Sequence, residues 1–526
     1  MYTPNASRGL PRHRSRYLAE RYTRWIMRTL VALMVLAILW LVLAFHLRGQ
    51  WMFALLFLVL GASMAVVFSK RHLMSHRYIF PALAGMGVFL IFPLLYTVGI
   101  SFTNYSSSNL LSEERVREQL LDQTYRAEGQ GFRFTLYAEG EKARLYLESE
   151  TAEGDSATGA LLSEPFALSA ESVPRQLSVK QVADAPATRA LPMREVIAHR
   201  ELLQTLSLQT ASGTQLSMVG LRQFAPILPR YEQNADGSLT DLRDGGRLTP
   251  DQDTGFFRNA EGEKLTPGWP VPVGMENYTR IFADPDIRGP FLQIFVWTFV
   301  FAGLTVVFTL AVGFVLATLL QWEQLRGKAV YRTLLILPYA VPAFISILIF
   351  KGMFNQHYGE INLILESLFG ISPDWFTDPA LARAMLLIVN TWLGYPYMLL
   401  LCMGLIQSIP QDLYEASAID GGGAITNMMK ITLPLIIKPL TPLLIAAFAF
   451  NFNNFVLIAL LTGGAPDILG ASTPAGTTDL LVSYTYRIAF QDSGQQFGLA
   501  AAIATLIFVL VAALSWLNLR LTRVKV

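Results

Sequence analysis

The sequence of 526 residues has only one cysteine, Cys402, and its six histidines are scattered along the chain. A single cysteine cannot form a disulfide within the chain, so an exported part would need an ordinary packed core. His72 and His76 have i, i+4 spacing, but basic residues from Lys70 to Arg77 surround them. We therefore interpret this stretch as a basic turn between two spans and predict no metal site.

Charged residues are also scarce. They make up 15% of the chain, against roughly 25% in soluble domains, whereas 52% of the residues are hydrophobic. This composition predicts a polytopic membrane protein. Residues 1–101 carry 11 Lys and Arg but one acid, whereas residues 102–290 carry 19 bases and 27 acids. The acidic middle block is therefore expected to face a different compartment from the basic N-terminus.

Three further absences concern energy and catalysis. No G-x-x-x-x-G-K-[ST] pattern occurs, so the chain cannot hold a nucleotide in a P-loop, and we find no nucleophile–histidine pair. No ionisable residue lies near the centre of an apolar run, although an ion-coupled carrier usually needs a buried carboxylate. We predict no catalytic or cofactor-binding residues and a separate energy source. The alternatives are an ion-coupled secondary sugar carrier, a membrane-anchored sensor or scaffold, and a membrane enzyme.

Long apolar runs, by contrast, are abundant. A membrane span needs about 20 mostly apolar residues. Eight runs meet that length: Trp25–Phe45, Trp51–Phe68, Ile79–Ser101, Phe291–Gln321, Ala329–Phe354, Ala384–Gly404, Thr441–Leu461 and Phe497–Leu519. The first run is too long for the apolar part of a signal peptide, and no small-residue cleavage site follows it. We expect it to remain as an anchor.

Lysine and arginine in short loops favour the cytoplasmic side of a membrane. They occur in the N-terminus from Arg8 onwards, in the second, fourth and sixth loops, and in the C-terminus at Arg520, Arg523 and Lys525. Eight spans with both termini in the cytoplasm satisfy this rule throughout. The expected domains are 1–101, with the basic N-terminus and spans one to three; 102–290, an exported insertion; and 291–526, with spans four to eight and a cytoplasmic loop at about 405–440.

The exported block is long enough to form a domain. In "GFRFTLYAEGEKARLYLES" apolar and polar residues alternate on both sides of Gly140, which is typical of a β-hairpin. We interpret the Asp- and Gly-rich stretch from Asn234 to Gly262 as an irregular linker. The block as a whole is predicted to be a compact β-rich domain, and the alternative is a loosely ordered loop.

Neutral polar residues gather in two of the spans. The stretch "FAFNFNNFVL" contains three asparagines, and "NTWLGYPYM" places Asn390 beside aromatic residues. On a helix Phe450, Asn451 and Asn454 are expected to share a face, since neighbours lie three and four residues apart. Asparagine amides donate and accept hydrogen bonds, and aromatic rings offer a flat apolar surface to a sugar ring. The cluster indicates a path for a neutral polyhydroxylated solute; the alternative is that the asparagines bond one helix to another.

The predicted cytoplasmic loop Leu405–Leu440 is far longer than a turn. We expect one helix to start near Ser408, Gly421–Gly423 to interrupt it, and a second helical stretch to lead into the next span. A short helix connected through glycines is suited to dock on a partner protein, and Glu415 gives this helix a negative charge. The alternative is an idle amphipathic helix on lipid, which fits poorly because the loop lacks clustered Lys and Arg.

Within this loop, "EASAIDGGGAITNMMKITLP" resembles the EAA loop of ABC importer permeases. The matching positions are Glu415, Ala416, Gly421, Ile431, Leu433 and Pro434, with Ser417 in place of the second alanine. In that family the short helix of the loop sits in a groove of a separate ATPase subunit. The resemblance implies that Glu415 occupies the contact position, and that ATP and magnesium bind in the partner ATPase.

Further stretches, among them "GMENYTRIF", "LILPYAVPAF" and "FNQHYGEIN", resemble carbohydrate importer permeases, in particular the larger permease subunits of maltose and maltodextrin importers. The resemblance implies an all-α polytopic membrane protein of eight transmembrane helices in a bacterial inner membrane, with a β-rich periplasmic domain inserted after the third helix. The implied partners are a homologous second permease subunit, a dimeric ATP-binding subunit, a periplasmic sugar-binding protein, and maltose or maltodextrin, but no nucleic acid.

In those permeases the sugar site lies midway across the membrane. The resemblance implies that its residues here are Gly394, Tyr397, Phe450, Asn451 and Asn454, with the two rings stacking on the sugar and the asparagines bonding its hydroxyls. A serine that the family places one turn before the phenylalanine is Ala447 here, so one sugar hydrogen bond, worth about 1 kcal/mol, is in question. Another oligosaccharide is the alternative cargo.

Overall fold

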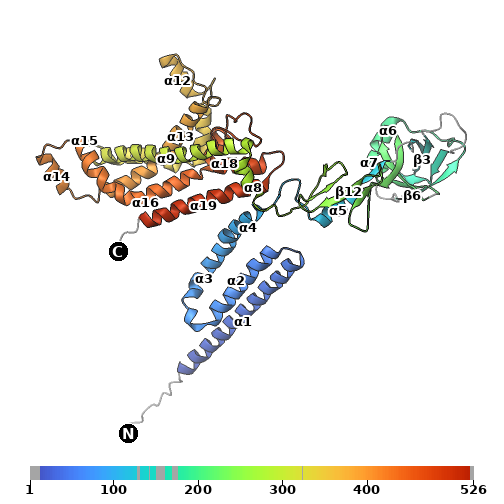
Figure 1. Cartoon of the computed structure of the whole chain (residues 1–526), viewed down its shortest axis with the longest axis horizontal. Coiled ribbons are helices and arrows are strands. Elements are labelled where there is room, and N and C mark those ends of the chain that lie inside the picture. The colour runs from blue at the N-terminus through green and yellow to red at the C-terminus, as the bar shows by residue number, and fades with distance from the viewer. Residues whose placement is uncertain are drawn as a thin grey trace, which may run out of the picture. The chain divides into compact units, whose positions relative to one another are not determined.

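The computed structural model describes residues 12–126, 131–140, 142–149, 160–168, 176–211, 213–322 and 324–521. The chain separates into two compact units, one made of Met1–Thr103 and Val273–Val526 and the other of Asn104–Pro272. The first is helical and the second is rich in β-strands, which confirms the predicted fold class (Figure 1). Arg8, Arg523 and Lys525, which contribute to the predicted orientation, lie outside the described residues.

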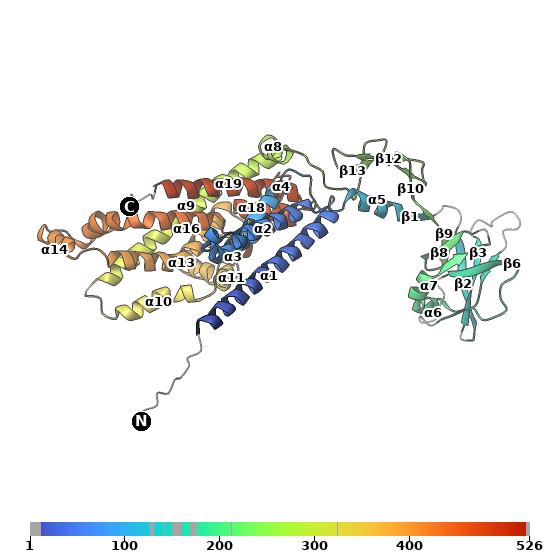
Figure 2. The ribbon, with the colours of Figure 1, turned by 90° about the horizontal axis from the view of Figure 1, so that it is seen from below.

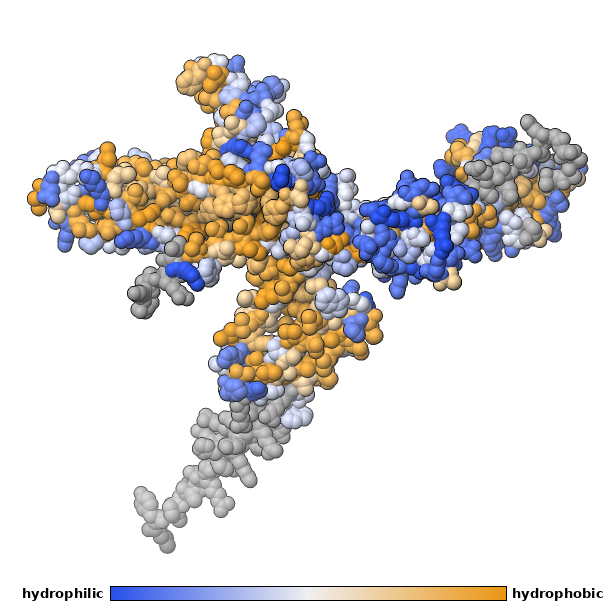
Figure 3. All heavy atoms as spheres, in the orientation of Figure 1, coloured by the Kyte–Doolittle hydropathy of each residue, from blue (hydrophilic) through white to orange (hydrophobic). Residues whose placement is uncertain are grey.

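The helical unit contains the long apolar helices. Its elements are α1 Arg12–Leu47, α2 Trp51–Ser69, η1 Arg71–Leu73, α3 His76–Met86, η2 Gly87–Ile91, α4 Phe92–Ile100, α8 Glu276–Ala283, α9 Pro285–Gln321, α10 Lys328–Ala340, α11 Ala343–Met353, α12 Glu360–Phe369, α13 Pro379–Ile406, α14 Asp412–Ile419, α15 Ala424–Thr426, η3 Asn427–Thr432, α16 Leu433–Phe452, α17 Phe455–Leu461, α18 Leu481–Phe490 and α19 Phe497–Leu521. In the described part of the chain, seven helices are long and apolar enough to cross a membrane, or eight if the bent pair α10 and α11 is one span. Apolar residues cover much of the visible outer surface of this unit (Figure 3). Such a surface is unusual for a soluble protein and suits a lipid environment.

The predicted span Ala329–Phe354 is not one straight helix. α10 and α11 are bent by 91° relative to each other. Val341 between them is extended, with φ −87° and ψ 130°, and Pro342 follows it directly. The ring of a proline disfavours the helical region for the preceding residue, so the chain turns at this point.

The predicted span Thr441–Leu461 is also interrupted, and its helix begins earlier, at Leu433. α16 ends at Phe452, and α17 starts at Phe455. The side-chain oxygen of Asn454 accepts a hydrogen bond from the backbone N–H of Leu457 at 3.4 Å, so Asn454 caps α17. Asparagine favours caps over helix interiors, which explains a break within an apolar run.

Four helices, α9, α13, α16 and α19, run side by side in the bundle (Figure 2). α9 and α13 approach each other closely at Gly313, where a Cβ would lie 2.7 Å from the backbone nitrogen of Leu399. Any larger side chain at Gly313 would push the two helices apart. This contact sets the spacing of two helices that carry polar residues.

An additional helix, α18, lies between α17 and α19, where the sequence predicted a loop. A buried ion pair ties the preceding segment to it, because Nη1 of Arg487 donates to Asp479 at 2.9 Å. Asp479 has no solvent exposure and also accepts from the hydroxyl of Ser483 and the N–H of Gly476, each at 2.8 Å. These bonds offset part of the cost of burying the charge.

The second unit is built on a nine-stranded sheet. Its elements are α5 Glu113–Leu121, β1 Thr124–Arg126, β2 Phe132–Glu139, β3 Lys142–Ser149, β4 Ala160–Ser163, β5 Phe166–Ala167, β6 Gln176–Val182, α6 Met193–Ala198, α7 Arg200–Thr205, β7 Ser207–Gln209, β8 Gln215–Gly220 and β9 Gln223–Pro229. Because β9 pairs with β2 on one side and β8 on the other, the sheet closes on itself. The predicted hairpin is confirmed: β2 and β3 are antiparallel, and Leu136, Leu145 and Leu147 are fully buried.

The interpretation of Asn234–Gly262 as an irregular linker is wrong. The stretch forms most of a five-stranded antiparallel sheet of β10 Tyr231–Gln233, β11 Leu239–Asp241, β12 Arg247–Asp251, β13 Phe256–Arg258 and β14 Lys264–Leu265. Its turns contain the four glycines with positive φ, Gly237, Gly245, Gly255 and Gly262. The strands are two to five residues long, too short to show an alternating pattern in the sequence.

Candidate functional site

A polar network joins three helices and the break before α17. The side-chain amide of Asn390 on α13 donates to Oγ1 of Thr305 on α9 at 3.1 Å and to Oδ1 of Asn451 on α16 at 2.8 Å. Its oxygen accepts from Nδ2 of Asn454 at 3.2 Å. Asn390, Thr305 and Asn451 expose 5%, 1% and 9% of their surface. Asn390 is therefore the hub of a buried network that links the two polar segments.

The other amides of the network make further hydrogen bonds. Nδ2 of Asn451 donates to the carbonyl of Ala447 at 2.8 Å, and Oδ1 of Asn454 accepts from the N–H of Leu457. Buried polar groups are normally paired in this way, also inside membranes. In this conformation the amides bond one helix to another, which is the alternative that the sequence left open.

The expectation that Phe450, Asn451 and Asn454 share a helix face is wrong. Asn454 lies beyond the end of α16, and Phe450 exposes 73% of its surface whereas Asn451 is buried. Tyr397 on α13 exposes 38%. The two rings predicted to stack on a sugar are thus accessible, while the amides predicted to bond it are engaged with each other.

Gly394 lies one helical turn after Asn390 on α13 and faces α9. A Cβ at Gly394 would lie 2.8 Å from Cγ2 of Thr309, so the missing side chain lets the two helices meet. The neighbouring Tyr395 donates from its hydroxyl to the carbonyl of Leu335 on α10 at 3.0 Å. α13 therefore contacts both α9 and α10 close to the network.

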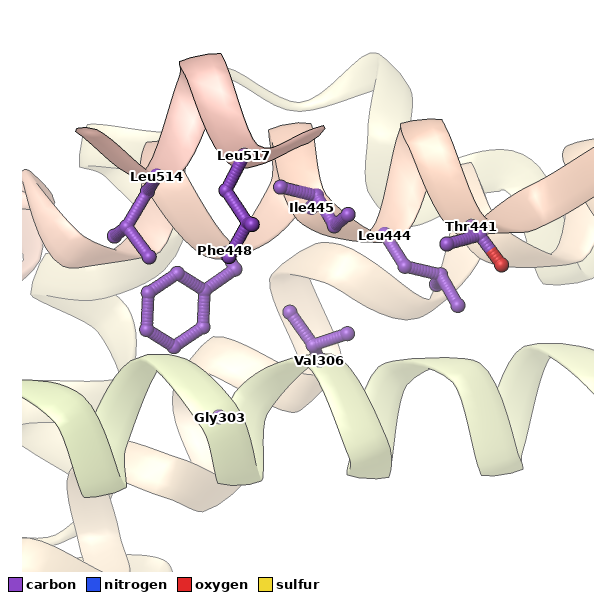
Figure 4. A pocket seen from close by; sticks show the side chains of 8 residues that line it. All are labelled: Gly303, Val306, Thr441, Leu444, Ile445, Phe448, Leu514 and Leu517. Atoms are coloured by element: carbon purple, nitrogen blue, oxygen red, sulfur yellow. The ribbon is translucent and has the colours of Figure 1, made fainter. Parts of the chain in front are cut away.

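An apolar groove of about 350 Å³ lies between α9, α16 and α19 (Figure 4). It is lined by Gly303, Val306, Thr441, Leu444, Ile445, Phe448, Leu514 and Leu517. No predicted sugar-site residue is among them, and Thr441 contributes their only side-chain hydroxyl. The groove does not suit a polyhydroxylated solute, whose hydroxyls would lose hydrogen bonds to water without replacement.

The predicted coupling loop follows α13. The expected helix start near Ser408 is wrong, because the Ser408 hydroxyl donates to the carbonyl of Leu405 at 2.7 Å and α14 begins only at Asp412. The interruption at the glycines is confirmed: α14 ends at Ile419 and α15 begins at Ala424. α15 continues through the π-helix η3 directly into α16.

The positions that match the EAA pattern lie in two places. On and just after α14 are Glu415, Ala416, Ser417 and Gly421. Where η3 joins α16 are Ile431, Leu433 and Pro434. Glu415 is exposed, and Ile419 and Ile425 on either side of the glycines expose 87% and 75% of their surface. The solvent-exposed surface of the loop therefore includes the carboxylate of Glu415 and two isoleucine side chains.

Asn390 stands in one of the two polar stretches but was not predicted to belong to the site, and Thr305 was not predicted at all. The available signal was a row of threonines in an apolar helix, Thr298, Thr305 and Thr309, at intervals of seven and four residues. Such spacing places them on one side of the helix. All three are buried.

The helical unit defines the class of protein. Residues 309–523 match the family of binding-protein-dependent transport system inner membrane components, so the chain is a permease of that class. Residues 111–274 match the P2 domain of the maltose transport system permease protein MalF, and residues 25–72 match the N-terminal transmembrane helices of MalF.

Relatives of similar length show which family within this class of permeases the chain belongs to. The maltose/maltodextrin transport system permease protein MalF of Klebsiella aerogenes is 52% identical over 504 residues, which cover 94% of this chain and 96% of that protein. MalF of Photorhabdus laumondii is 54% identical over 503 residues, with the same coverage. A bacterial ABC transporter involved in the import of alginate aligns with 48% of this chain and 83% of its own, at a TM-score of 0.41 and 21% identity. The chain belongs to the MalF family of maltose/maltodextrin transport system permease proteins, which confirms the resemblance found in its sequence.

Proposed function

We propose that the chain is the permease subunit of an ATP-driven, binding-protein-dependent importer of maltose or maltodextrins, and that it forms the translocation path by alternating access. The observation that best supports this function is the course of α16. The helix begins in the coupling loop at Leu433, and its other end carries Asn451 of the polar network. Its 20 residues span roughly 30 Å, so one element joins the loop to the network.

The proposed sugar site comprises Gly394, Tyr397, Phe450, Asn451 and Asn454. The exposed rings of Tyr397 and Phe450 stack on the sugar, and its hydroxyls take over hydrogen bonds that the amides make to one another in this conformation. The exchange of one hydrogen bond for another changes the free energy little. In the empty site these amides are therefore paired with one another. In the loaded site the hydroxyls of the sugar replace those partners, so the amides stay hydrogen-bonded.

The proposed partners act on both sides of the membrane. The coupling loop docks on a separate dimeric ATPase, which binds ATP with magnesium, so this chain is not itself an enzyme. A homologous second permease subunit completes the path, and a periplasmic sugar-binding protein docks on residues 102–290. The chain resides in the bacterial inner membrane, with both termini in the cytoplasm. Because coupling between sites is reciprocal, the loaded binding protein outside favours the ATP-bound state inside.

The test is the substitution Glu415→Lys in the complete complex reconstituted in liposomes. Glu415 is exposed on α14 and contacts the ATPase in this proposal, so charge reversal weakens assembly and abolishes sugar-stimulated ATP hydrolysis. The matched control is Glu366→Lys, an equal charge change at an exposed position of α12, which keeps both activities. Near-normal uptake in Glu415→Lys would rule out the coupling role, and wild-type uptake that persists without ATP would favour an ion-coupled carrier.

A further inference from the structure

Two side-chain contacts tie α14 back to the segment that leads into α16. The hydroxyl of Tyr414 lies 3.0 Å from Oγ1 of Thr432, and the hydroxyl of Ser417 donates to Oδ1 of Asn427. We call these contacts the two clasps. They join residues 18 and 10 positions apart in the chain, across the glycines that interrupt the loop.

The direction of the first clasp follows from the hydrogen bonds of Thr432. Its hydroxyl has one proton, which it donates to the carbonyl of Asn427 at 3.1 Å. Tyr414 must therefore be the donor to Thr432. Thr432 exposes only 2% of its surface and is the last residue of η3, directly before α16. A phenylalanine at position 414 would remove this bond and leave the other bond of Thr432 in place.

The second clasp depends on the glycine at position 422. The N–H of Gly422 donates to the carbonyl of Ser417 at 2.7 Å, so the chain folds back on the end of α14. A Cβ on Gly422 would overlap the Ser417 hydroxyl and lie 2.9 Å from the Ser417 carbonyl oxygen. A Cβ on Gly423 would meet nothing within 4 Å, and its φ of −86° suits any residue. Of these two glycines only Gly422 is required by the clasp.

We propose that Tyr414, Thr432 and Asn427 are positioning residues that make α14 and α16 move as one body. This inference rests on the proposed function, in which an ATPase displaces α14. Glycines are conformationally permissive, so without the clasps a displacement of α14 is absorbed by rotation about Gly421–Gly423. With the clasps, the displacement passes through Thr432 into α16 and reaches Asn451 at its far end.

The experiment measures sugar uptake and ATP hydrolysis in the same liposomes, with the ATPase, the second permease subunit and the sugar-binding protein present. Tyr414→Phe and Gly422→Ala each lower the ratio of sugar imported to ATP hydrolysed about fivefold, the size expected from the loss of one hydrogen bond. ATP hydrolysis without sugar-loaded binding protein rises in both variants. Thr432→Ser, which keeps the hydroxyl, and Gly423→Ala, which adds a methyl group into open space, keep the wild-type ratio.

Two results would overturn the inference. One is a wild-type ratio in both Tyr414→Phe and Gly422→Ala. The other is a parallel loss of uptake and hydrolysis together with loss of the ATPase from the purified complex, because the clasps would then serve docking alone. A wild-type complex that shows no sugar-stimulated hydrolysis would instead refute the proposed function, so the two failures are distinguishable.

Discussion

Asn390 bonds to three different segments, so the consequences of replacing it extend beyond one contact. Leucine has a similar size but no polar atoms. In Asn390→Leu the amides of Asn451 and Asn454 and the hydroxyl of Thr305 each lose a partner in an apolar setting. We expect a loss of about 1–2 kcal/mol in stability. A lower midpoint of thermal denaturation in detergent and an uptake rate reduced at least severalfold would show this loss.

The neighbouring Asn453 offers a matched control for this substitution. It directly follows α16 and is exposed, and its amide donates to the carbonyl of Ala449 on that helix at 3.2 Å. Asn453→Leu should change the stability by no more than about 0.5 kcal/mol. Equal effects of the two substitutions would mean that Asn390 is not the hub of the network.

At this scale the sequence predicted which residue types gather but not how they pair. The asparagines and rings of the polar cluster were visible as unusual residues in apolar runs. Their partners were not, because Thr305 lies 85 positions from Asn390 and becomes a neighbour only when α9 packs on α13. The burial of Asn451 beside the exposed Phe450 likewise depends on packing that periodicity alone does not determine.

Among the elements, the turn between β12 and β13 is held by one carboxylate. Asp251 accepts from the hydroxyl of Thr254 at 2.7 Å and from the N–H of Asp253 at 3.0 Å, and it pairs with Arg258 at 2.7 Å. These contacts, chiefly the bond from Thr254, hold the pKa of Asp251 below its ordinary value. The turn is therefore most stable when Asp251 is ionised.

This shift predicts how the five-stranded sheet responds to acid. A lowered pKa contributes stability that is present above the unfolded pKa of about 3.9 and is lost as the pH falls through the lower folded pKa. Hydrogen exchange at the amides of Phe256–Arg258, corrected for intrinsic rates, should stay slow from pH 7 to about 5 and accelerate below about 4. Thr254→Val removes the chief contact that lowers this pKa, so exchange in the variant should be faster already at pH 7 and its further acceleration below about pH 4 should be smaller. An unchanged profile in that variant would contradict the assignment.

Elements were predicted well where their sequence signal is long. The β2–β3 hairpin has eight residues in each strand, and the apolar runs are about as long as a membrane span or longer. The five-stranded sheet was mistaken for a linker because its aspartates and glycines occupy turns between very short strands. The breaks at Pro342 and Asn454 were missed because a hydropathy pattern counts apolar residues and ignores backbone conformation.

Across the whole molecule, charge and hydropathy separate the chain into regions that prefer different surroundings. The compact unit Asn104–Pro272 lies within the acidic block 102–290, and the lysines and arginines of the helical unit lie mainly in its loops and near the ends of its helices. Composition predicts this division because a bilayer excludes charge from its core. The same argument predicts the orientation, with α14 in the cytoplasm and the segment between α17 and α18 outside.

Cysteine labelling tests this orientation directly, because the one native cysteine, Cys402, is fully buried. Leu469, between α17 and α18, exposes 96% of its surface, and Ile419 at the end of α14 exposes 87%. In a Cys402→Ala background, a membrane-impermeant maleimide should label Leu469→Cys in spheroplasts, whose inner membrane is intact. It should label Ile419→Cys only after that membrane is permeabilised. In cells that lack the ATPase, no docked partner covers Ile419, and both side chains are almost fully exposed in the chain itself, so failure to react reports the membrane barrier. Labelling of Ile419→Cys before permeabilisation would place α14 outside the cytoplasm, where no ATPase could reach it.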